Sequence, residues 1–310
     1  MNIFLNIIYL VGGVAGLYYG ADFLVKGGVD IARRCGISTL VIGLTLVAFA
    51  TSAPELAVSI SAALNNQPDI SLGNVIGSNI ANIGLILGLC GCILPMTVNR
   101  QLLKFDTPVM LAATLILAAL CTFCSGISRL AGLILFILLL AYIAWNVYAS
   151  RKNMEKEEKH IPEYPLYLAI IIVAASLGVL VGGAKAFLAG AVYFAKMLNF
   201  SDAVIGLTIV AVGTSLPELA TSIVAACKGE KDIAIGNVVG SNIFNILGII
   251  GLTSIVSPIS NTSLNYIDFG VMVFISILLM IFMLSSKILN RIESAILLLI
   301  YIIYTVHLCI

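Results

Sequence analysis

Long apolar stretches follow one another along almost the whole chain, with only brief polar interruptions between them. A membrane-spanning helix needs about 20 apolar residues to cross roughly 30 Å of hydrocarbon. The polarity within the stretches does not alternate as it would in the strands of a β-barrel. We therefore predict an all-α integral membrane fold with ten transmembrane helices. The predicted spans are residues 3–25, 38–64, 69–95, 106–124, 128–149, 166–195, 202–227, 232–258, 265–285 and 290–309.

The composition excludes a water-soluble globule. Of the 310 residues, 61% are hydrophobic and 10% are charged, whereas a soluble protein carries about 25% charged residues. The first apolar stretch is too long for the apolar core of a signal peptide, so we interpret it as the first span. The longest polar stretch lies mid-chain. It divides the sequence into a five-helix repeat at 1–149, a cytoplasmic linker at 150–165 and a second five-helix repeat at 166–310.

Two parts of the chain are copies of each other. Residues 43–95 align with 206–258 without a gap, at a constant offset of 163, and about 30 of the 53 positions are identical. The most similar segments pair ATSAPELAVS (50–59) with GTSLPELATS (213–222), and GNVIGSNIANIG (73–84) with GNVVGSNIFNIL (236–247). Each copy contains five predicted spans, an odd number, so the copies enter the membrane from opposite sides. This predicts the inverted repeats of secondary transporters.

The distribution of basic residues predicts the orientation, because Lys and Arg are enriched on the cytoplasmic side. With the N-terminus outside, 13 of the 16 Lys and Arg residues fall on the inner side. Only Arg129, Lys185 and Lys196 fall on the outer side or in a span that leads to it. We therefore expect a multi-pass protein of the cell (plasma) membrane with both termini extracellular.

Glu55 and Glu218 are equivalent carboxylates in the middle of apolar stretches. An ionisable group at this depth is costly and needs a partner or a water-filled cavity. The repeated segments around them contain no Lys or Arg before the inner loop at Lys228. The two acids should meet near the midplane and either bind a cation or take up protons. The alternative is that each is a protonated residue used only in packing.

Neutral oxygen donors accompany both acids in the two copies. Hard cations such as Ca²⁺ take 6–8 oxygen ligands, and the lack of His or Cys at these positions argues against zinc or copper. Isolated Ser and Thr residues in membrane helices often serve only in packing, but here they recur twice around an acid. The candidates are Thr51, Ser52, Ser78 and Asn82 in the first copy, and Thr214, Ser215, Ser241 and Asn245 in the second.

Pro54 and Pro217 predict a break beside each acid. Proline lacks the N–H that would bond to the carbonyl four residues earlier, here that of Ala50 or Gly213. The freed carbonyls should line the cavity. Outside these segments, Asp22 in the first span aligns with Lys185 in the sixth, and we interpret both as interface or gating residues.

The paired GTSxPE-type and GNxxGSNxxN-type segments resemble the two alpha-repeats of the calcium/cation antiporter superfamily, and most closely those of prokaryotic sodium/calcium exchangers. This resemblance covers nearly the whole chain. It implies that the first and sixth helices slide across a core of the other eight. It also implies Ca²⁺ between Glu55 and Glu218, helped by the carbonyls of Thr51 and Thr214. Na⁺ sites would flank it, with ligands from Ala48, Ser52 and Ser78 on one side and from Ala211, Thr214, Ser215 and Ser241 on the other.

The sequence departs from some prokaryotic relatives at Asn82 and Asn245, because one of these positions can carry an acid. Both are neutral amides here, so the site has at most two formal negative charges. Two charges match one Ca²⁺, but three Na⁺ would leave a net charge of +1. The coupling stoichiometry is therefore open.

We predict an antiporter that exchanges Na⁺ for Ca²⁺ by alternating access. The transported ions would be its only ligands besides lipid, with no cofactor, nucleic acid or obligatory protein partner. An H⁺/Ca²⁺ or K⁺-dependent exchanger could use the same fold, although the repeats lack His and further central acids. A cation channel is a more distant alternative, because channel filters usually lie between subunits. An enzyme is disfavoured, because the chain has no G-x-S-x-G or H-E-x-x-H motif.

Overall fold

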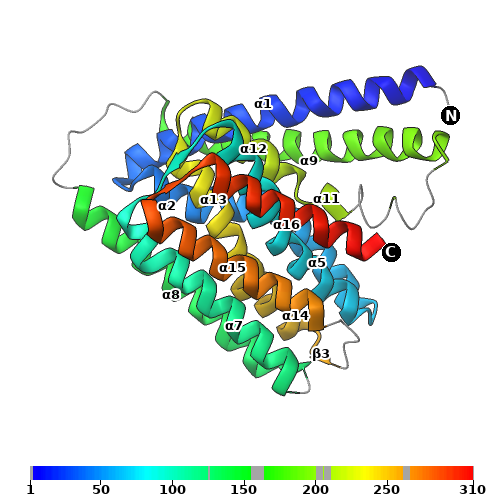
Figure 1. Cartoon of the computed structure of the whole chain (residues 1–310). Helices are drawn as coiled ribbons and strands as arrows, with labels where there is room; N and C mark the ends of the chain where they lie inside the picture. Colours follow the sequence, from blue (N-terminus) through cyan, green and yellow to red (C-terminus); the bar gives the residue numbers. More distant parts are fainter. Residues whose placement is uncertain are drawn as a thin grey trace.

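The computed structural model describes residues 3–124, 126–154, 164–199, 205, 211–260 and 266–309. Nearly all of them are helical (Figure 1). The elements of the first repeat are α1 (Ile3–Cys35), α2 (Thr39–Ile42), η1 (Gly43–Val47), α3 (Ala48–Thr51), α4 (Ala53–Leu64), α5 (Pro68–Ala81), η2 (Asn82–Leu87), α6 (Gly88–Ile93), β1 (Met96–Thr97), η3 (Leu102–Asp106), α7 (Thr107–Phe123), β2 (Gly126–Ile127) and α8 (Arg129–Met154). The η elements are π-helical.

The described elements of the second repeat follow the order of their counterparts in the first. They are α9 (Leu166–Met197), α11 (Ala211–Gly213), α12 (Leu216–Cys227), α13 (Lys231–Ile243), η5 (Phe244–Ile250), α14 (Gly251–Val256), β3 (Ile259–Ser260), α15 (Tyr266–Ser286), β4 (Ile288–Leu289) and α16 (Arg291–Cys309).

The helices agree with nine of the ten predicted spans. Eight helices in the described part of the chain are long and apolar enough to cross a membrane. A ninth span is a bent pair, Thr39–Thr51 with Ala53–Leu64, whose halves meet at 47°. The predicted span 202–227 lies partly outside the described residues, and its described part ends in the apolar helix α12.

The predicted break in the second span is confirmed. The helix is interrupted at Ser52, and Pro54 lies in the first turn of α4. Two backbone hydrogen bonds bridge the interruption, from Ser52 N to Ala48 O (3.0 Å) and from Leu56 N to Ser52 O (3.1 Å). The Ala50 carbonyl faces a proline without an N–H. Pro217 has the same place in α12, which begins after Ser215.

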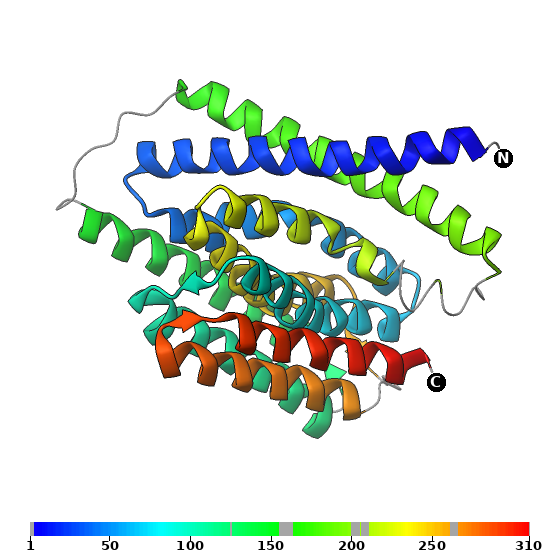
Figure 2. The ribbon, with the colours of Figure 1, turned by 45° about the horizontal axis from the view of Figure 1, so that its top comes forward.

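The repeats are inverted and interlocked. Helices α1 and α9 occupy equivalent positions in the two repeats and run in opposite directions side by side (Figures 1 and 2). Short strands join the repeats in a reciprocal way, because β1 pairs with β4 and its counterpart β3 pairs with β2. A buried hydrogen bond is also duplicated: Tyr142 OH donates to Asp106 Oδ1 at 2.9 Å, and Tyr304 OH donates to Asp268 Oδ1 at 2.8 Å.

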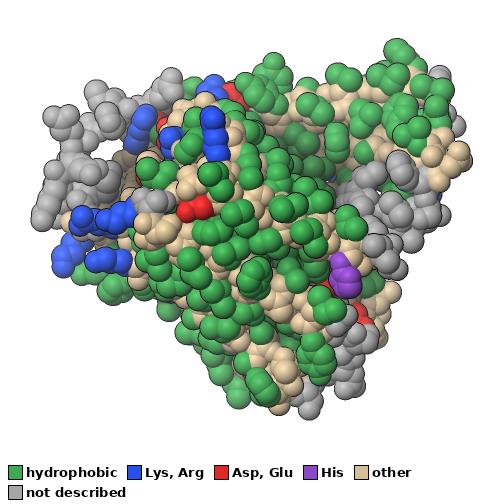
Figure 3. All heavy atoms as spheres, viewed as in Figure 1, with side chains coloured by type: hydrophobic (Ala, Val, Ile, Leu, Met, Phe, Trp, Pro, Cys, Tyr) green, Lys and Arg blue, Asp and Glu red, His purple; other side chains and the backbone are tan. Residues whose placement is uncertain are grey.

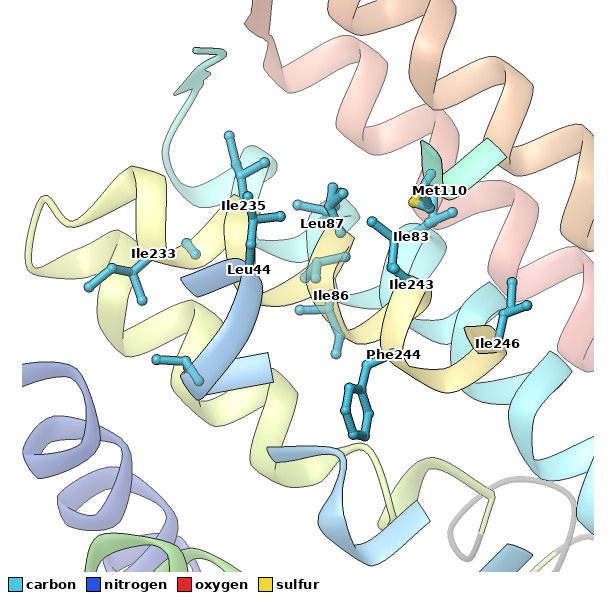
Figure 4. Packing of buried hydrophobic residues seen from close by; sticks show 14 of the residues in the cluster. Leu44, Ile83, Ile86, Leu87, Met110, Ile233, Ile235, Ile243, Phe244 and Ile246 are labelled. Atoms are coloured by element: carbon cyan, nitrogen blue, oxygen red, sulfur yellow. The ribbon is translucent and has the colours of Figure 1, made fainter. Parts of the chain in front are cut away.

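The third and eighth spans form the centre of the molecule. Other helices enclose the whole of an 18-residue apolar stretch within Lys231–Val256. Figure 4 shows how Leu44 of η1, Ile83 and Leu87 of η2 and Met110 of α7 surround the α13–η5 segment. Gly236 and Gly240 allow η1 to approach closely, because a Cβ at Gly240 would lie 2.5 Å from the Leu44 carbonyl oxygen. The spacing of these two glycines, GxxxG, is typical of closely packed membrane helices.

Helices α1 and α9 pack mainly against each other and lie along one side of the bundle (Figure 2). Glycines bring their backbones together: a Cβ at Gly183 would lie 2.8 Å from Leu17 N, and one at Gly13 would lie 2.5 Å from Phe187 N. Large apolar side chains cover the visible outer surface (Figure 3). Most Lys and Arg side chains in this view gather at the end opposite the two termini (Figures 1 and 3).

Candidate cation-binding site

Glu55 and Glu218 lie in the first turn of α4 and α12, just after the two helix breaks. Their side chains are 0% and 1% exposed. Each helix begins in mid-span because proline prevents the preceding helix from continuing. Each carboxylate therefore lies at a helix N-terminus, where the helix dipole stabilises negative charge. The carbonyl oxygens at the C-terminal end of α3 lie at the same break. The break therefore exposes the partial negative charge of these carbonyls and the partial positive charge of the N-terminus of α4.

Hydrogen bonds between the repeats bring the two carboxylates into one site. Ser52 Oγ donates to Glu218 Oε1 at 2.9 Å, and Ser215 Oγ donates to Glu55 Oε1 at 3.2 Å. These bonds are equivalent, since Ser52 and Ser215 occupy the same position in the two copies. Each acid is therefore held by a hydroxyl group from the other repeat.

The second oxygen of each carboxylate has no hydrogen-bond partner among the residues that the structure describes. Glu55 Oε2 and Glu218 Oε2 are buried and accept no hydrogen bond from the part of the chain that the structure describes. The described ion pairs involve Asp22 and Asp30, not these acids. Because a buried carboxylate without a partner is strongly unfavourable, the arrangement calls for a cation or protons between the repeats.

Most of the predicted neutral donors are buried, and Ser52, Ser78 and Ser215 are linked to the carboxylates through hydrogen bonds. Thr51, Ser52, Ser215 and Ser241 are at most 1% exposed, and Ser78 is 4% exposed. Ser78 Oγ lies 3.3 Å from Ser215 Oγ and can donate to it while Ser215 donates to Glu55, so the hydroxyls come together from both repeats. Ser241 Oγ is buried with no hydrogen-bond partner in the described chain. Thr214 is half-buried beside the break, Ala48 lies in α3, and Ala211 begins α11.

The amides Asn82 and Asn245 take part in a reciprocal pair of hydrogen bonds. Asn82 Nδ2 donates to Asn242 Oδ1, and Asn245 Nδ2 donates to Asn79 Oδ1, both at 3.0 Å. These bonds turn the Oδ1 atoms of Asn82 and Asn245 away from protein donors, and both oxygens are buried with no partner in the described chain. Asn82 begins the π-helical segment η2 and Asn245 is the second residue of η5, and π-helical geometry is frequent at functional sites.

Sequence reasoning did not single out four further asparagines of the duplicated motif. Asn79 and Asn242 orient the amides just described. Asn74 Nδ2 donates to the Glu55 carbonyl at 3.1 Å and to Ser59 Oγ at 2.9 Å, and Asn237 makes the equivalent bonds in the second repeat. Their repetition at the same offset was the available signal. Ser59 and Ser222, which lie on the same helix stripe as the acids, contact these asparagines.

A cleft of about 670 Å³ runs between α4 and α9. Asn65 and Gln67 line it beyond the C-terminal end of α4, and Thr214 and Pro217 line it beside the break. Lys185 of α9 also lines this cleft. The cleft therefore connects one end of the bundle with the neighbourhood of the carboxylates.

Comparison with known proteins shows the family of the chain. The model of the family described as "Sodium/calcium exchanger protein" matches residues 5–148 and 168–310. The chain belongs to this family. It is 37% identical to the putative antiporter CaxA of Alkalimonas amylolytica, covering 96% of each chain. It is 34% identical to the sodium/calcium exchanger MaX1 of Methanosarcina acetivorans, covering 97% of each.

A solved structure of the sodium–calcium exchanger NCX_Mj, soaked with zero Na⁺ and Ca²⁺, has the same fold. Its TM-score is 0.86 at 35% identity, and the match covers 99% of this chain and 100% of the other. The ten-helix, inverted-repeat fold class predicted from the sequence is thus confirmed. Family membership also identifies the protein as a transporter, with cation/Ca²⁺ antiport as its class of activity, and not as an enzyme.

Proposed function

We propose that the protein exchanges Na⁺ for Ca²⁺, with Ca²⁺ held between Glu55 and Glu218. The observation that carries this proposal is a pair of buried carboxylate oxygens, one from each repeat, that have no hydrogen-bond partner among the described residues. Two carboxylates neutralise one Ca²⁺, and the nearby hydroxyl, amide and carbonyl oxygens supply the type of ligand that this ion prefers. The carbonyls of Thr51 and Thr214 complete the proposed coordination.

Na⁺ binds in this proposal at flanking sites built from neutral oxygens and shared carboxylates. One site uses Ser52, Ser78 and the Ala48 carbonyl. The other uses Ser215, Ser241, Thr214 and the Ala211 carbonyl. Ions of both kinds compete for the same two negative charges, so occupancy by Na⁺ lowers the affinity for Ca²⁺. This competition is what couples the two fluxes. The Oδ1 atoms of Asn82 and Asn245 are further neutral ligands within this site.

The protein spans the cell membrane with both termini outside in this proposal. The gathering of Lys and Arg at the end opposite the termini supports this orientation. The cleft between α4 and α9 then opens to the exterior, because Asn65 and Gln67 follow a span that begins inside. The structure would thus be open outward. One chain supplies both halves of the site, so a monomer suffices for transport.

The test is ⁴⁵Ca²⁺ uptake into Na⁺-loaded proteoliposomes. We expect uptake that requires internal Na⁺, saturates with Ca²⁺ and collapses when external Na⁺ equals internal Na⁺. A matched preparation loaded with choline should remain inactive. Uptake driven by a pH gradient without Na⁺ would identify an H⁺/Ca²⁺ exchanger. A requirement for K⁺ would identify a K⁺-dependent exchanger. Ca²⁺ flux without any counter-ion would identify a channel.

A further inference from the structure

The two ends of the α1–α9 pair make different contacts with the rest of the molecule, although the repeats are equivalent. At the predicted inner end, α1 packs along α12. At the outer end, the cleft separates α9 from α4. A residue that lines the outer cleft is more exposed than its equivalent in the second repeat: Val58 of α4 is 38% exposed whereas Thr221 of α12 is 0% exposed.

The closed inner interface contains an ion pair. Asp22 of α1, only 8% exposed, accepts from Lys26 Nζ at 3.0 Å and contacts Lys228 Nζ. Lys26 lies one turn further along α1 and moves with Asp22. Lys228 instead caps the C-terminal end of α12 and belongs to the other repeat. The Asp22–Lys228 pair therefore ties the α1–α9 pair to the core at the side that is closed.

The equivalent positions at the open end carry different chemistry. Asp22 corresponds to Lys185, and Lys228 corresponds to Asn65, the residue that caps the C-terminal end of α4. Both Lys185 and Asn65 are exposed and line the outer cleft. Closing that cleft in the manner of the inner interface would bring the Lys185 ammonium to the Asn65 amide and the last carbonyls of α4. An ammonium is stabilised at a helix C-terminus, but a neutral amide attracts it less than a carboxylate does.

We propose that Asp22–Lys228 is the inner latch of the transport cycle and that Lys185 with the Asn65 end of α4 is the outer latch. The inner latch holds the outward-open state. It breaks when α1 and α9 shift along the core, and the outer latch then forms. Since the inner latch joins two full charges and the outer latch only one, the empty protein rests open to the outside. This inference rests on the alternating access of the proposed function, not on the identity of the coupling ion.

The test measures which side is open in a Cys-free background. Ser61 lines the open cleft, and its equivalent Val224 is 7% exposed in the closed interface. Ser61→Cys is labelled from outside and Val224→Cys from inside with a membrane-impermeant thiol reagent, in choline buffer without Na⁺ or Ca²⁺. We expect D22N to raise labelling of Val224→Cys about tenfold, with a fall at Ser61→Cys. A tenfold change corresponds to about 1.4 kcal/mol between the two states.

Further variants keep the test decisive. K228Q should act like D22N and serves in its place if D22N does not fold. N65D should also raise labelling of Val224→Cys, because the new carboxylate would pair with Lys185 and strengthen the outer latch. The matched control is D30N: Asp30 binds Arg34 of α1 and the Tyr164 N–H just before α9, groups that move together. It should leave both labelling rates unchanged.

Unchanged labelling in D22N and K228Q would contradict the proposed latch. An equal rise in labelling at Ser61→Cys and Val224→Cys would also contradict it, because it would indicate that the whole structure has loosened. Normal Na⁺-driven Ca²⁺ exchange in those same variants would leave the proposed function standing. Conversely, the labelling shift does not depend on the coupling ion. A protein that shows the shift but exchanges Ca²⁺ for H⁺ would retain the latch and lose the Na⁺ assignment.

Discussion

Replacing either buried carboxylate by its amide should weaken Ca²⁺ much more than Na⁺. Two unit charges about 4 Å apart interact by roughly 4 kcal/mol at an effective dielectric constant of about 20, and a divalent ion doubles this value to about 8 kcal/mol. Glutamine keeps a carbonyl ligand and is cheaper to bury, which offsets about half of the loss. E55Q and E218Q should therefore each weaken Ca²⁺ binding by about 4 kcal/mol, or roughly 1,000-fold. The loss for Na⁺ should be about 2 kcal/mol, or roughly 30-fold.

Calorimetric titration of purified protein with each ion measures both affinities directly. D106N is the matched control, because Asp106 is also 0% exposed within a membrane span but bonds to Tyr142 away from the site. It should lower thermal stability and leave the affinity for Ca²⁺ unchanged. Retention of Ca²⁺ affinity within tenfold of wild type in folded E55Q or E218Q would refute the two-carboxylate site. An equal loss for Na⁺ and Ca²⁺ would refute the charge argument.

The flanking hydroxyls should separate the sodium sites from the calcium site. S78A and S241A should each raise the Na⁺ concentration that half-saturates exchange about tenfold, because a lost neutral ligand costs about 1.4 kcal/mol. The Ca²⁺ concentration that half-saturates exchange should change by less than about threefold. Equal losses for both ions would show that these serines have only a structural role. Orientation is tested separately by H307C and K287C in a Cys-free background. Impermeant reagent added outside should label the first and spare the second, and the reverse pattern would invert the topology.

The sequence allowed the spans, the breaks and the acids to be predicted because each depends on local chemistry. Apolar length predicts a span in any arrangement of helices. Proline removes a hydrogen bond whatever surrounds it, so the interruption at Ser52 followed from Pro54. The duplication then related Glu55 to Glu218. An inverted repeat places equivalent residues at equal distances on either side of the midplane. Because both acids lie in mid-span, that distance is small, and the alignment predicted that they meet.

The partners of these groups could not be predicted in the same way, because they depend on how the two repeats interlock. Nothing local indicates that Ser52 donates to Glu218 and not to Glu55, three residues away along the same helix. Asn82 and Asn245 were candidates from the sequence, but the sequence did not show that Asn79 and Asn242 of the opposite repeats orient their amides. The contact between Asp22 and Lys228 likewise joins residues of different repeats.

The residues that differ between the two repeats determine which side of the membrane the empty site faces. The carboxylates and the serines that hold them exchange places under the pseudo-twofold axis. A ligand with equal affinity for two states shifts nothing between them. An ion bound only by symmetric ligands therefore cannot favour one open side. The bias must come from positions where the copies differ, and at the two interfaces these include Asp22 against Lys185 and Lys228 against Asn65. Ion selectivity and resting orientation therefore depend on different residues. N65D should change which side is open at rest and leave the relative affinities for Na⁺ and Ca²⁺ unchanged.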